Sequence, residues 1–195
     1  MTKRSFIDFC YLAICLLYTK FCYRSSRLLR LPIDIRNKHS ISFGKNLTTG
    51  RNCRIEAYSK DQDKVLFLGD NIEINDNVHI TASQSVVIGN NVLMASRIYI
   101  SDTSHGSYIG NQNDSHPDIF PKLRSLFCNS VKIEDNVWIG EGVSILPGSN
   151  IGKGAIIGAN SVVKGKIPSY SIAVGVPAKI IKQFNFDNKK WERLK

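Results

Sequence analysis

Four histidines are the side chains in this 195-residue sequence best suited to proton transfer near neutral pH. His105 lies in residues 101–106, which read SDTSHG, and His79 directly precedes an isoleucine. His39 and His116 have less patterned surroundings. A neutral imidazole can take the proton from a hydroxyl group while that oxygen attacks a carbonyl carbon. By residue type alone, a solvated or structural side chain is the favoured interpretation of a lone loop histidine.

Cysteine offers a second kind of chemistry, but its spacing does not suit metal binding or a disulfide framework. The cysteines are odd in number and include no Cys-x-x-Cys pair: Cys10, Cys15, Cys22, Cys53 and Cys128. Structural zinc sites draw on closely spaced cysteines and histidines. We therefore expect reduced thiols, no metal and a cytoplasmic location.

The elements that must position these residues are predicted by a six-residue repeat. Counting from Ile133 in steps of six gives isoleucine or valine each time, up to Val163. The same step links further residues earlier in the chain: Leu68, Ile74 and Ile80; Ile88, Met94 and Ile100; and, more weakly, Ile35, Ile41, Leu47 and Cys53. A period of six is neither helical nor strand-alternating, but it fits one short strand plus one tight turn. Three such units make a triangular coil, and stacked coils share a core.

The repeat is interrupted between Ile100 and Ile133. The interruption predicts a loop at about 101–130 that leaves the stack of coils, and His105 lies at its opening. Long excursions from a compact solenoid are usually functional.

The two ends of the chain differ from the middle in charge and pattern. The net charge is +10, and residues 1–30 together with 179–195 contribute +9 of it. Residues 6–18 are apolar except for Asp8, lack a signal-peptide cleavage site and are too few to span a bilayer. We expect 1–30 to form a helical segment that packs on the domain or lies at a membrane interface. The β-helix domain should cover 31–183, and 184–195 should form a short polar helix.

Four motifs occur in order through the repeat region. They are NVWIG at 136–140, ILPG at 145–148, IGANSVV at 157–163 and GVPAK at 175–179. With them the chain resembles the hexapeptide-repeat acyltransferases, most closely the sugar O-acetyltransferases of lipopolysaccharide O-antigen and capsule synthesis. The resemblance implies an all-β solenoid, a left-handed parallel β-helix, assembled as a homotrimer that binds acetyl-CoA between adjacent subunits. It also implies a sugar acceptor, free or lipid-linked.

The resemblance assigns roles to individual residues. His105 matches the catalytic base, and Asn75 matches an asparagine that orients the substrate. His79 and Asp102 are expected at the acceptor. Many relatives read Asp-His-x-His-Gly where this chain reads DTSHG at 102–106, so one of the two histidines is absent here.

The coenzyme is expected along the later coils. The residues predicted to contact it are Trp138, Gly140, Ala159, Lys164 and Lys179. Relatives often carry Val-Thr-Lys-Asp where this chain reads VKGK at 163–166, so the contacts there should differ.

Other functions stay open at the level of sequence. The same fold could acetylate the amine of an amino sugar or the hydroxyl of serine. A metal-dependent lyase of the γ-type carbonic anhydrase class would need three histidines on zinc, and the intervals between His79, His105 and His116 do not suit it. A non-catalytic β-helix scaffold is a further alternative. The basic ends carry no nucleic-acid-binding motif.

Overall fold

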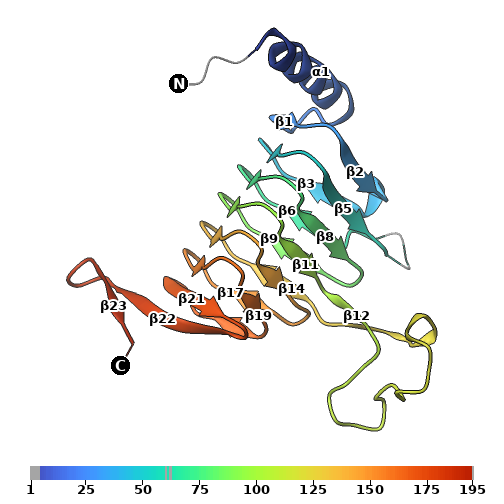
Figure 1. Ribbon diagram of the computed structural model, residues 1–195, viewed down its shortest axis with the longest axis vertical. Coiled ribbons are helices and arrows are strands. Elements are labelled where there is room, and N and C mark those ends of the chain that lie inside the picture. Colours follow the sequence, from blue (N-terminus) through green and yellow to red (C-terminus); the bar gives the residue numbers. More distant parts are fainter. Residues whose placement is uncertain (1–4, 60, 62, 195) are drawn as a thin grey trace.

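The computed structural model describes residues 5–59, 61 and 63–194 as a stack of coils with three faces (Figure 1). Among these residues the coil strands form three parallel sheets, called here faces A, B and C. The chain passes from A to B to C in each coil, so each coil strand pairs with the equivalent strand of the neighbouring coil. The predicted six-residue repeat therefore corresponds to one strand and one corner.

The strands of each face are as follows. Face A contains β1 (Leu28–Leu29), β4 (Thr48–Thr49), β7 (Glu73–Ile74), β10 (Leu93–Met94), β15 (Trp138–Ile139), β18 (Ile156–Ile157) and β21 (Ser171–Gly175). Face B contains β2 (Ile33–Arg36), β5 (Cys53–Ala57), β8 (His79–Ala82), β11 (Tyr99–Ser101), β16 (Ser144–Ile145) and β19 (Val162–Val163). Face C contains β3 (Ile41–Phe43), β6 (Leu66–Leu68), β9 (Val86–Ile88), β14 (Val131–Ile133), β17 (Asn150–Ile151) and β20 (Lys166–Ile167).

Aliphatic side chains at the hexad positions form the core. Ile133, Ile139 and Ile145 lie on faces C, A and B in turn, and each is fully shielded from solvent. The register stacks Ile139 between Met94 and Ile157. A single coil could not bury these side chains, so stacking supplies the hydrophobic stabilisation.

Asparagines turn the chain at the corner between faces C and A. Asn71, Asn91 and Asn136 have φ angles of 56°, 55° and 59°, in the left-handed region that asparagine tolerates better than most residues. The Asn71 amide donates to Asn91 and the Asn91 amide to Asn136, each at 3.1 Å. The corner is therefore a side-chain ladder as well as a set of turns.

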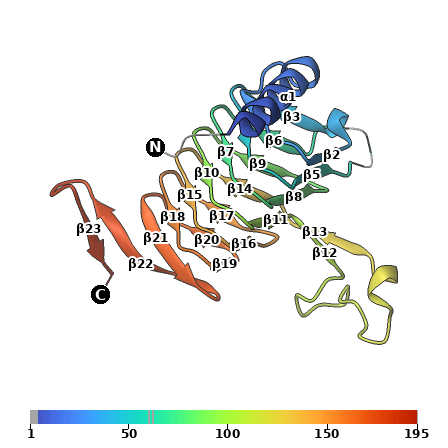
Figure 2. The ribbon, with the colours of Figure 1, turned by 45° about the horizontal axis from the view of Figure 1, so that its top comes forward.

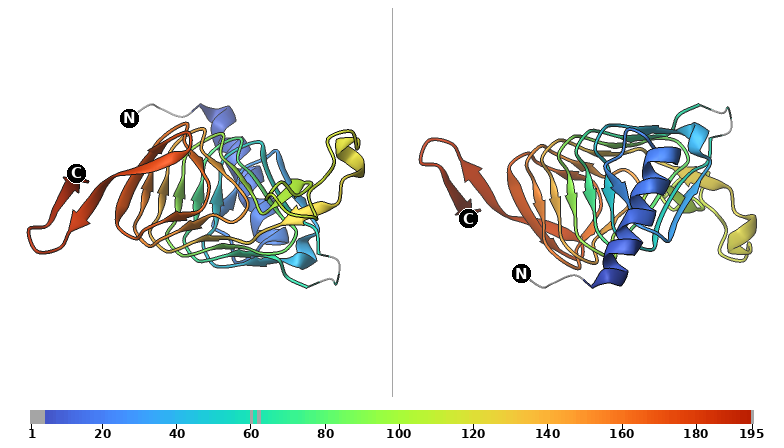
Figure 3. Two further views of the ribbon diagram at one scale, coloured as in Figure 1. Left: turned by 90° about the horizontal axis from the view of Figure 1, so that it is seen from below. Right: turned by 90° about the horizontal axis from the view of Figure 1, so that it is seen from above.

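The predicted N-terminal helical segment contains α1 (Phe6–Cys22), which lies across the first coil (Figure 3). Ser5 and Asp8 form a capping box at its start. The buried Thr19 hydroxyl accepts a hydrogen bond from the Leu29 backbone N–H at 2.8 Å, which joins the helix to β1. The contact places α1 over β1, the first strand of face A.

Within the described part of the chain, no helix combines the length and apolar content needed to cross a membrane.

The predicted excursion leaves the coil after β11 and returns at β14 (Figure 2). It starts and ends in an antiparallel hairpin of β12 (Thr103–His105) and β13 (Leu126–Cys128), and it contains the 3₁₀ turn η2 (Pro121–Leu123). A second 3₁₀ turn, η1 (Lys38–Ser40), follows β2.

The predicted C-terminal helix is wrong: the chain forms an antiparallel hairpin. β22 (Ala178–Asn185) continues face A beside β21 and pairs with β23 (Lys190–Arg193). Phe184 lies opposite Trp191 with ring centroids 5.3 Å apart, and Lys189 takes a left-handed φ of 57° in the turn. This cross-strand aromatic pair stabilises strands rather than a helix.

Candidate functional site

Five of the predicted site residues lie on two different edges of the coil. Edge A/B is the corner where the chain passes from face A to face B, and edge B/C is the corner where it passes from B to C. Asn75, Gly140 and Ala159 lie on edge A/B, after β7, β15 and β18. Asp102 and Lys164 lie on edge B/C, after β11 and β19. Within one chain these residues therefore form two separate groups.

Asn75 is held on edge A/B by bonds to the next coil. Its backbone N–H and its side-chain amide both donate to the Met94 carbonyl, at 3.0 and 2.9 Å. The residue is nevertheless exposed. Asn75 is thus a fixed polar group at the surface of this edge.

Asp102 anchors the point where the chain leaves the coil. Its carboxylate accepts hydrogen bonds from the backbone N–H groups of Ser83, Gln84 and Ser85, at 2.7–3.1 Å, and from the Thr103 hydroxyl at 2.7 Å. The residue is fully buried. The prediction that Asp102 contacts the acceptor does not match this position, because its oxygens already bind the turn of the preceding coil.

His105 ends β12, opposite Leu126 in the hairpin. Its carbonyl accepts a hydrogen bond from the Tyr108 hydroxyl at 2.7 Å, and that hydroxyl accepts one from Arg124, also at 2.7 Å. Gly106 follows with a φ of +102°, where a Cβ atom would stand 2.5 Å from the Tyr108 hydroxyl. The backbone at His105 is therefore well fixed, while the residue itself is exposed.

His79 lies on the outer surface of face B and is held by Glu56. His79 Nε2 is 2.9 Å from Glu56 Oε1. Because an ionised carboxylate only accepts hydrogen bonds, Nε2 carries the hydrogen and Nδ1 faces away from this bond. The Tyr99 ring packs beside the imidazole with centroids 5.5 Å apart. This carboxylate–imidazole pair fixes the orientation of the ring.

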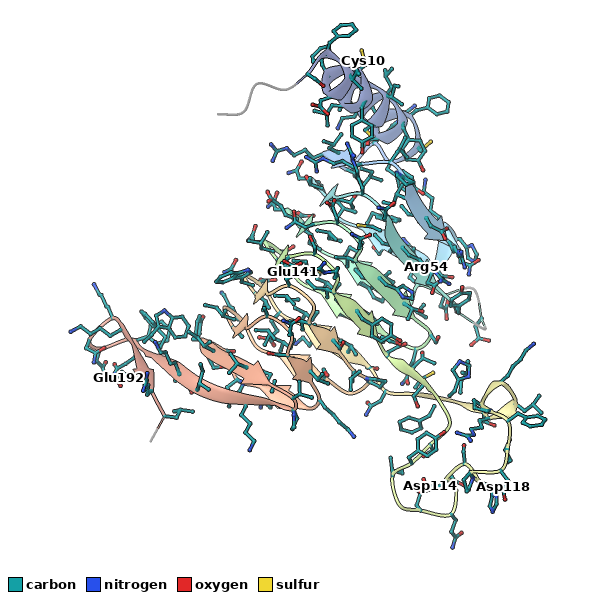
Figure 4. All side chains as sticks on the ribbon, viewed as in Figure 1. Cys10, Arg54, Asp114, Asp118, Glu141 and Glu192 are labelled. Carbon is teal, nitrogen blue, oxygen red and sulfur yellow. The ribbon has the colours of Figure 1, made fainter. Side chains whose placement is uncertain are left out.

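Glu56 is the centre of a polar cluster that the sequence did not reveal. Its side chain is only 4% exposed, and its other oxygen accepts hydrogen bonds from Arg54 Nε and from the Tyr58 hydroxyl, both at 2.8 Å. Burial alone would raise the pKa of the Glu56 carboxyl, but the bonds from His79, Tyr58 and Arg54 lower it below its ordinary value. Arg54 marks this cluster on the stack in Figure 4.

Strand alternation is the signal that could have pointed to Glu56. In residues 53–57 the side chains of Arg54 and Glu56 alternate with the inward Ile55, so both must face outward. The pairing of β5 with β8 then brings Arg54 level with His79. That pairing depends on the coil register, which the weaker early repeat left poorly defined.

The predicted coenzyme residues have different surroundings. Trp138 is half-exposed on face A, level with Leu93 and Ile156 in a column of apolar side chains. Gly140 is buried: a Cβ atom there would stand 2.6 Å from the Ala159 backbone nitrogen. A glycine is therefore needed for close stacking of two coils, irrespective of any ligand.

The two predicted lysines are exposed and lie on different edges. Lys164 follows β19 on edge B/C. Lys179 lies in β22 opposite Val174, next to the Gly158 corner of edge A/B. Both can supply positive charge, but on different sides of the chain.

A groove of about 770 Å³ opens on edge B/C beside the hairpin that carries His105. Tyr58, Gln84, Leu126 and Cys128 are among its lining residues. Across residues 5–59, 61 and 63–194, no group of three or more histidine, cysteine or acidic side chains is placed to hold a metal ion.

Comparison with known proteins gives a family-model match, curated relatives and solved structures of similar fold. A family model described as bacterial transferase hexapeptide (six repeats) matches residues 130–165. The "Putative lipopolysaccharide biosynthesis O-acetyl transferase WbbJ" of Escherichia coli K12 is 45% identical over 177 residues, which cover 91% of this chain and 89% of that protein.

Two solved structures share the architecture. A mutant of AntD, an N-acyltransferase from Bacillus cereus in complex with dTDP-4-amino-4,6-dideoxyglucose and coenzyme A, superposes with a TM-score of 0.68. It is 23% identical and the match covers 95% of this chain and 92% of that one, which is a likeness of fold. A galactoside acetyltransferase in complex with coenzyme A has a TM-score of 0.50 at 26% identity, covering 80% of this chain and 66% of that one.

Proposed function

Because this chain belongs to the hexapeptide-repeat acetyltransferases, we propose that it transfers an acetyl group from acetyl-CoA to a sugar hydroxyl in surface polysaccharide synthesis. The 45% identity to a lipopolysaccharide O-acetyl transferase over most of both chains supports this acceptor class. The position of His105 carries the chemistry: an exposed imidazole on a fixed backbone, at the root of the excursion.

His105 acts as the general base. Its neutral imidazole takes the proton from the acceptor hydroxyl as the oxygen attacks the thioester carbonyl carbon. A tetrahedral oxyanion forms and collapses, which breaks the carbon–sulfur bond. The CoA thiolate leaves, and the imidazolium returns the proton to the sulfur. The transfer is direct, without an acyl-enzyme.

The complete site needs two protomers. Asn75 lies before β8, and Thr81, near the end of β8, pairs with Ser101, so the width of face B lies between edge A/B and edge B/C. His105 lies four residues beyond Ser101, on a strand that continues away from the coil (Figure 1). We therefore infer that the Asn75 and His105 of one site come from different protomers. A ring of three left-handed coils would place edge B/C of one protomer against edge A/B of the next.

Acetyl-CoA would lie along edge A/B of the later coils. Ala159 on that edge and Trp138 on the adjoining face A offer exposed apolar surface, and Lys179 offers positive charge to the phosphates. Lys164 would reach the same coenzyme from edge B/C of the neighbouring protomer. Gly140 contributes by letting the coils stack closely beneath this surface.

The acceptor would enter beside the hairpin, where the groove lies. His79, oriented by Glu56 and flanked by Tyr99, presents a polar group on face B that suits a sugar hydroxyl. The cysteines are all unbridged, which suits a cytoplasmic enzyme. A lipid-linked sugar at the membrane is the acceptor we expect.

The test is thiol release from acetyl-CoA by the purified protein with a panel of sugars, amino sugars and serine. We expect release that depends on a sugar hydroxyl and falls about a hundredfold or more in His105→Ala. His116→Ala is the matched control, because His116 is an exposed histidine of the same loop, near Asp118. It should retain wild-type activity.

Three results would contradict the proposal. Full activity in His105→Ala with loss of activity in His79→Ala would indicate that His79 on face B is the base. Release that depends on an amine or on serine would change the acceptor class. If neither acceptor-dependent release nor calorimetric CoA binding occurred, the lyase or scaffold alternatives would stand instead.

A further inference from the structure

The side of α1 that faces away from the coils carries large apolar side chains, where a surface helix usually carries polar ones. Its large apolar side chains are between 46% and 86% exposed: Phe6, Ile7, Phe9, Ile14, Leu16, Leu17 and Phe21. At 3.6 residues per turn they cover about half of the helix circumference. A surface helix normally turns this side toward the core. We call these seven side chains the outer face of α1.

Specific contacts fix the helix so that the outer face stays outward. Cys15 and Thr19 are fully buried against the first coil. The Tyr11 hydroxyl donates to the Leu31 carbonyl at 2.7 Å, and the Leu31 N–H donates to the Cys15 sulfur at 3.4 Å. The polar atoms of Tyr11, Cys15 and Thr19 thus face the protein. Figure 4 labels Cys10 on the side of α1 that faces away from the coils.

Basic residues lie close to the outer face along the sequence. Lys20 lies within it, and Arg24 and Arg27 follow in the exposed turn after the helix. Lys3 and Arg4 precede the helix in the sequence, outside the described residues. In residues 1–30 Asp8 is the one acidic residue, and its carboxylate serves the capping box.

We propose that α1 is an interfacial helix that docks the protein on an anionic phospholipid bilayer. The outer face would enter the boundary between headgroups and acyl chains, and the basic residues would bind phosphate groups. Since α1 lies across the end of the stack (Figure 3), the coils would rise away from the membrane. This deepens the proposed function, since it would keep the site near lipid-linked acceptors, but it depends only on α1 and its surroundings.

Flotation of the purified full-length protein with lipid vesicles, without acetyl-CoA, tests the proposal. We expect binding to phosphatidylcholine vesicles that contain phosphatidylglycerol, and at least tenfold weaker binding to phosphatidylcholine alone. Phe6→Ser with Leu17→Ser should weaken binding to the anionic vesicles about tenfold or more, since both side chains contact little of the protein. Phe120→Ser with Leu123→Ser is the control, because these side chains are equally exposed on the distant loop.

A charge variant tests the electrostatic part. Arg24→Glu with Arg27→Glu should weaken binding to anionic vesicles about tenfold or more, whereas Lys189→Glu with Lys190→Glu at the C-terminal turn should not. The Phe6 and Leu17 double variant and the Arg24 and Arg27 double variant should both keep the wild-type melting temperature and the wild-type rate with a water-soluble sugar. An intact rate with lost binding separates this proposal from the catalytic one.

Several outcomes would overturn the proposal. One such outcome is that the wild type fails to float with anionic vesicles or binds both vesicle types equally. The loop control would lose binding as strongly as the α1 variant, which would indicate general adhesion. Alternatively, light scattering would show that Phe6→Ser with Leu17→Ser splits a larger oligomer while no form binds vesicles. In that case a second copy covers the outer face.

Discussion

Subunit complementation tests directly whether the Asn75 and His105 of one site come from different protomers. Each variant, Asn75→Ala and His105→Ala, should lose activity alone, by about tenfold and about a hundredfold respectively. If each site joins His105 of one protomer to Asn75 of the next, a mixed ring contains an intact pair. The two chains of low activity should then restore each other.

The size of the effect follows from the ring. A trimer with two copies of one variant and one of the other has three neighbouring pairs, and one of them joins an intact His105 to an intact Asn75. Doubly tagged mixed trimers should therefore show about one third of the wild-type rate. In such a mixed trimer no single chain has both residues intact. A site formed within one chain would therefore gain no activity from mixing.

The assay is co-expression of the two variants with different tags, purification over both tags in sequence and measurement of thiol release from acetyl-CoA. Mixed trimers of wild type with each variant serve as controls for the tags. Activity that stays at the mean of the two single variants would refute the shared site, and so would a monomeric mass by light scattering.

Further predictions concern single side chains and stability. Asp102→Ala leaves backbone N–H groups of residues 83–85 without their acceptor, so it should cost about 3 kcal/mol and lower the melting temperature by about 6–12 °C. Asp135→Asn, which alters a half-buried corner aspartate that accepts the backbone N–H of Asn90, should cost less than about 1 kcal/mol in the same thermal scan. Because the pKa of Glu56 is lowered in the folded state, its contribution to stability is complete above the ordinary glutamate pKa and is lost as the pH falls through the lowered one. The unfolding free energy of Glu56→Gln should therefore lie below that of the wild type near pH 7, and the gap should close on acidification; a gap that widened would contradict this reasoning. Gly140→Ala should cost about 1–3 kcal/mol in urea unfolding, because its Cβ atom would meet backbone of the next coil; an unchanged midpoint would mean that the coils can move apart.

The repeat region was predictable because its physics is local and periodic. Each hexad places one aliphatic side chain inside, so Ile133 and its successors identify their own strands without knowledge of the partner coils. The interruption at 101–130 was visible for the same reason, since losing the period means leaving the stack. His105 could then be placed at its opening.

The parts that escaped prediction depend on contacts between distant segments. The C-terminal hairpin is stabilised by Phe184 against Trp191, a single aromatic pair across a turn. No sequence repeat predicts such a pair. Asp102 looked available for a substrate because its donors lie 17–19 residues earlier in the chain. Glu56 and His79 are 23 residues apart and meet only through the pairing of β5 with β8.

The excursion is spliced into the coil without disturbing the coil's hydrogen bonding. On the entry side Ile100 pairs with Ile80 and Ile145, and on the return side Ile133 pairs with Ile88 and Ile151, all in the ordinary parallel register. The entropy of closing a flexible segment rises only slowly with its length. The segment between the two strands of the hairpin can thus be lengthened, shortened or exchanged while the core keeps its register. The loop beside the proposed acceptor site can consequently change in length and sequence without a change in the coils.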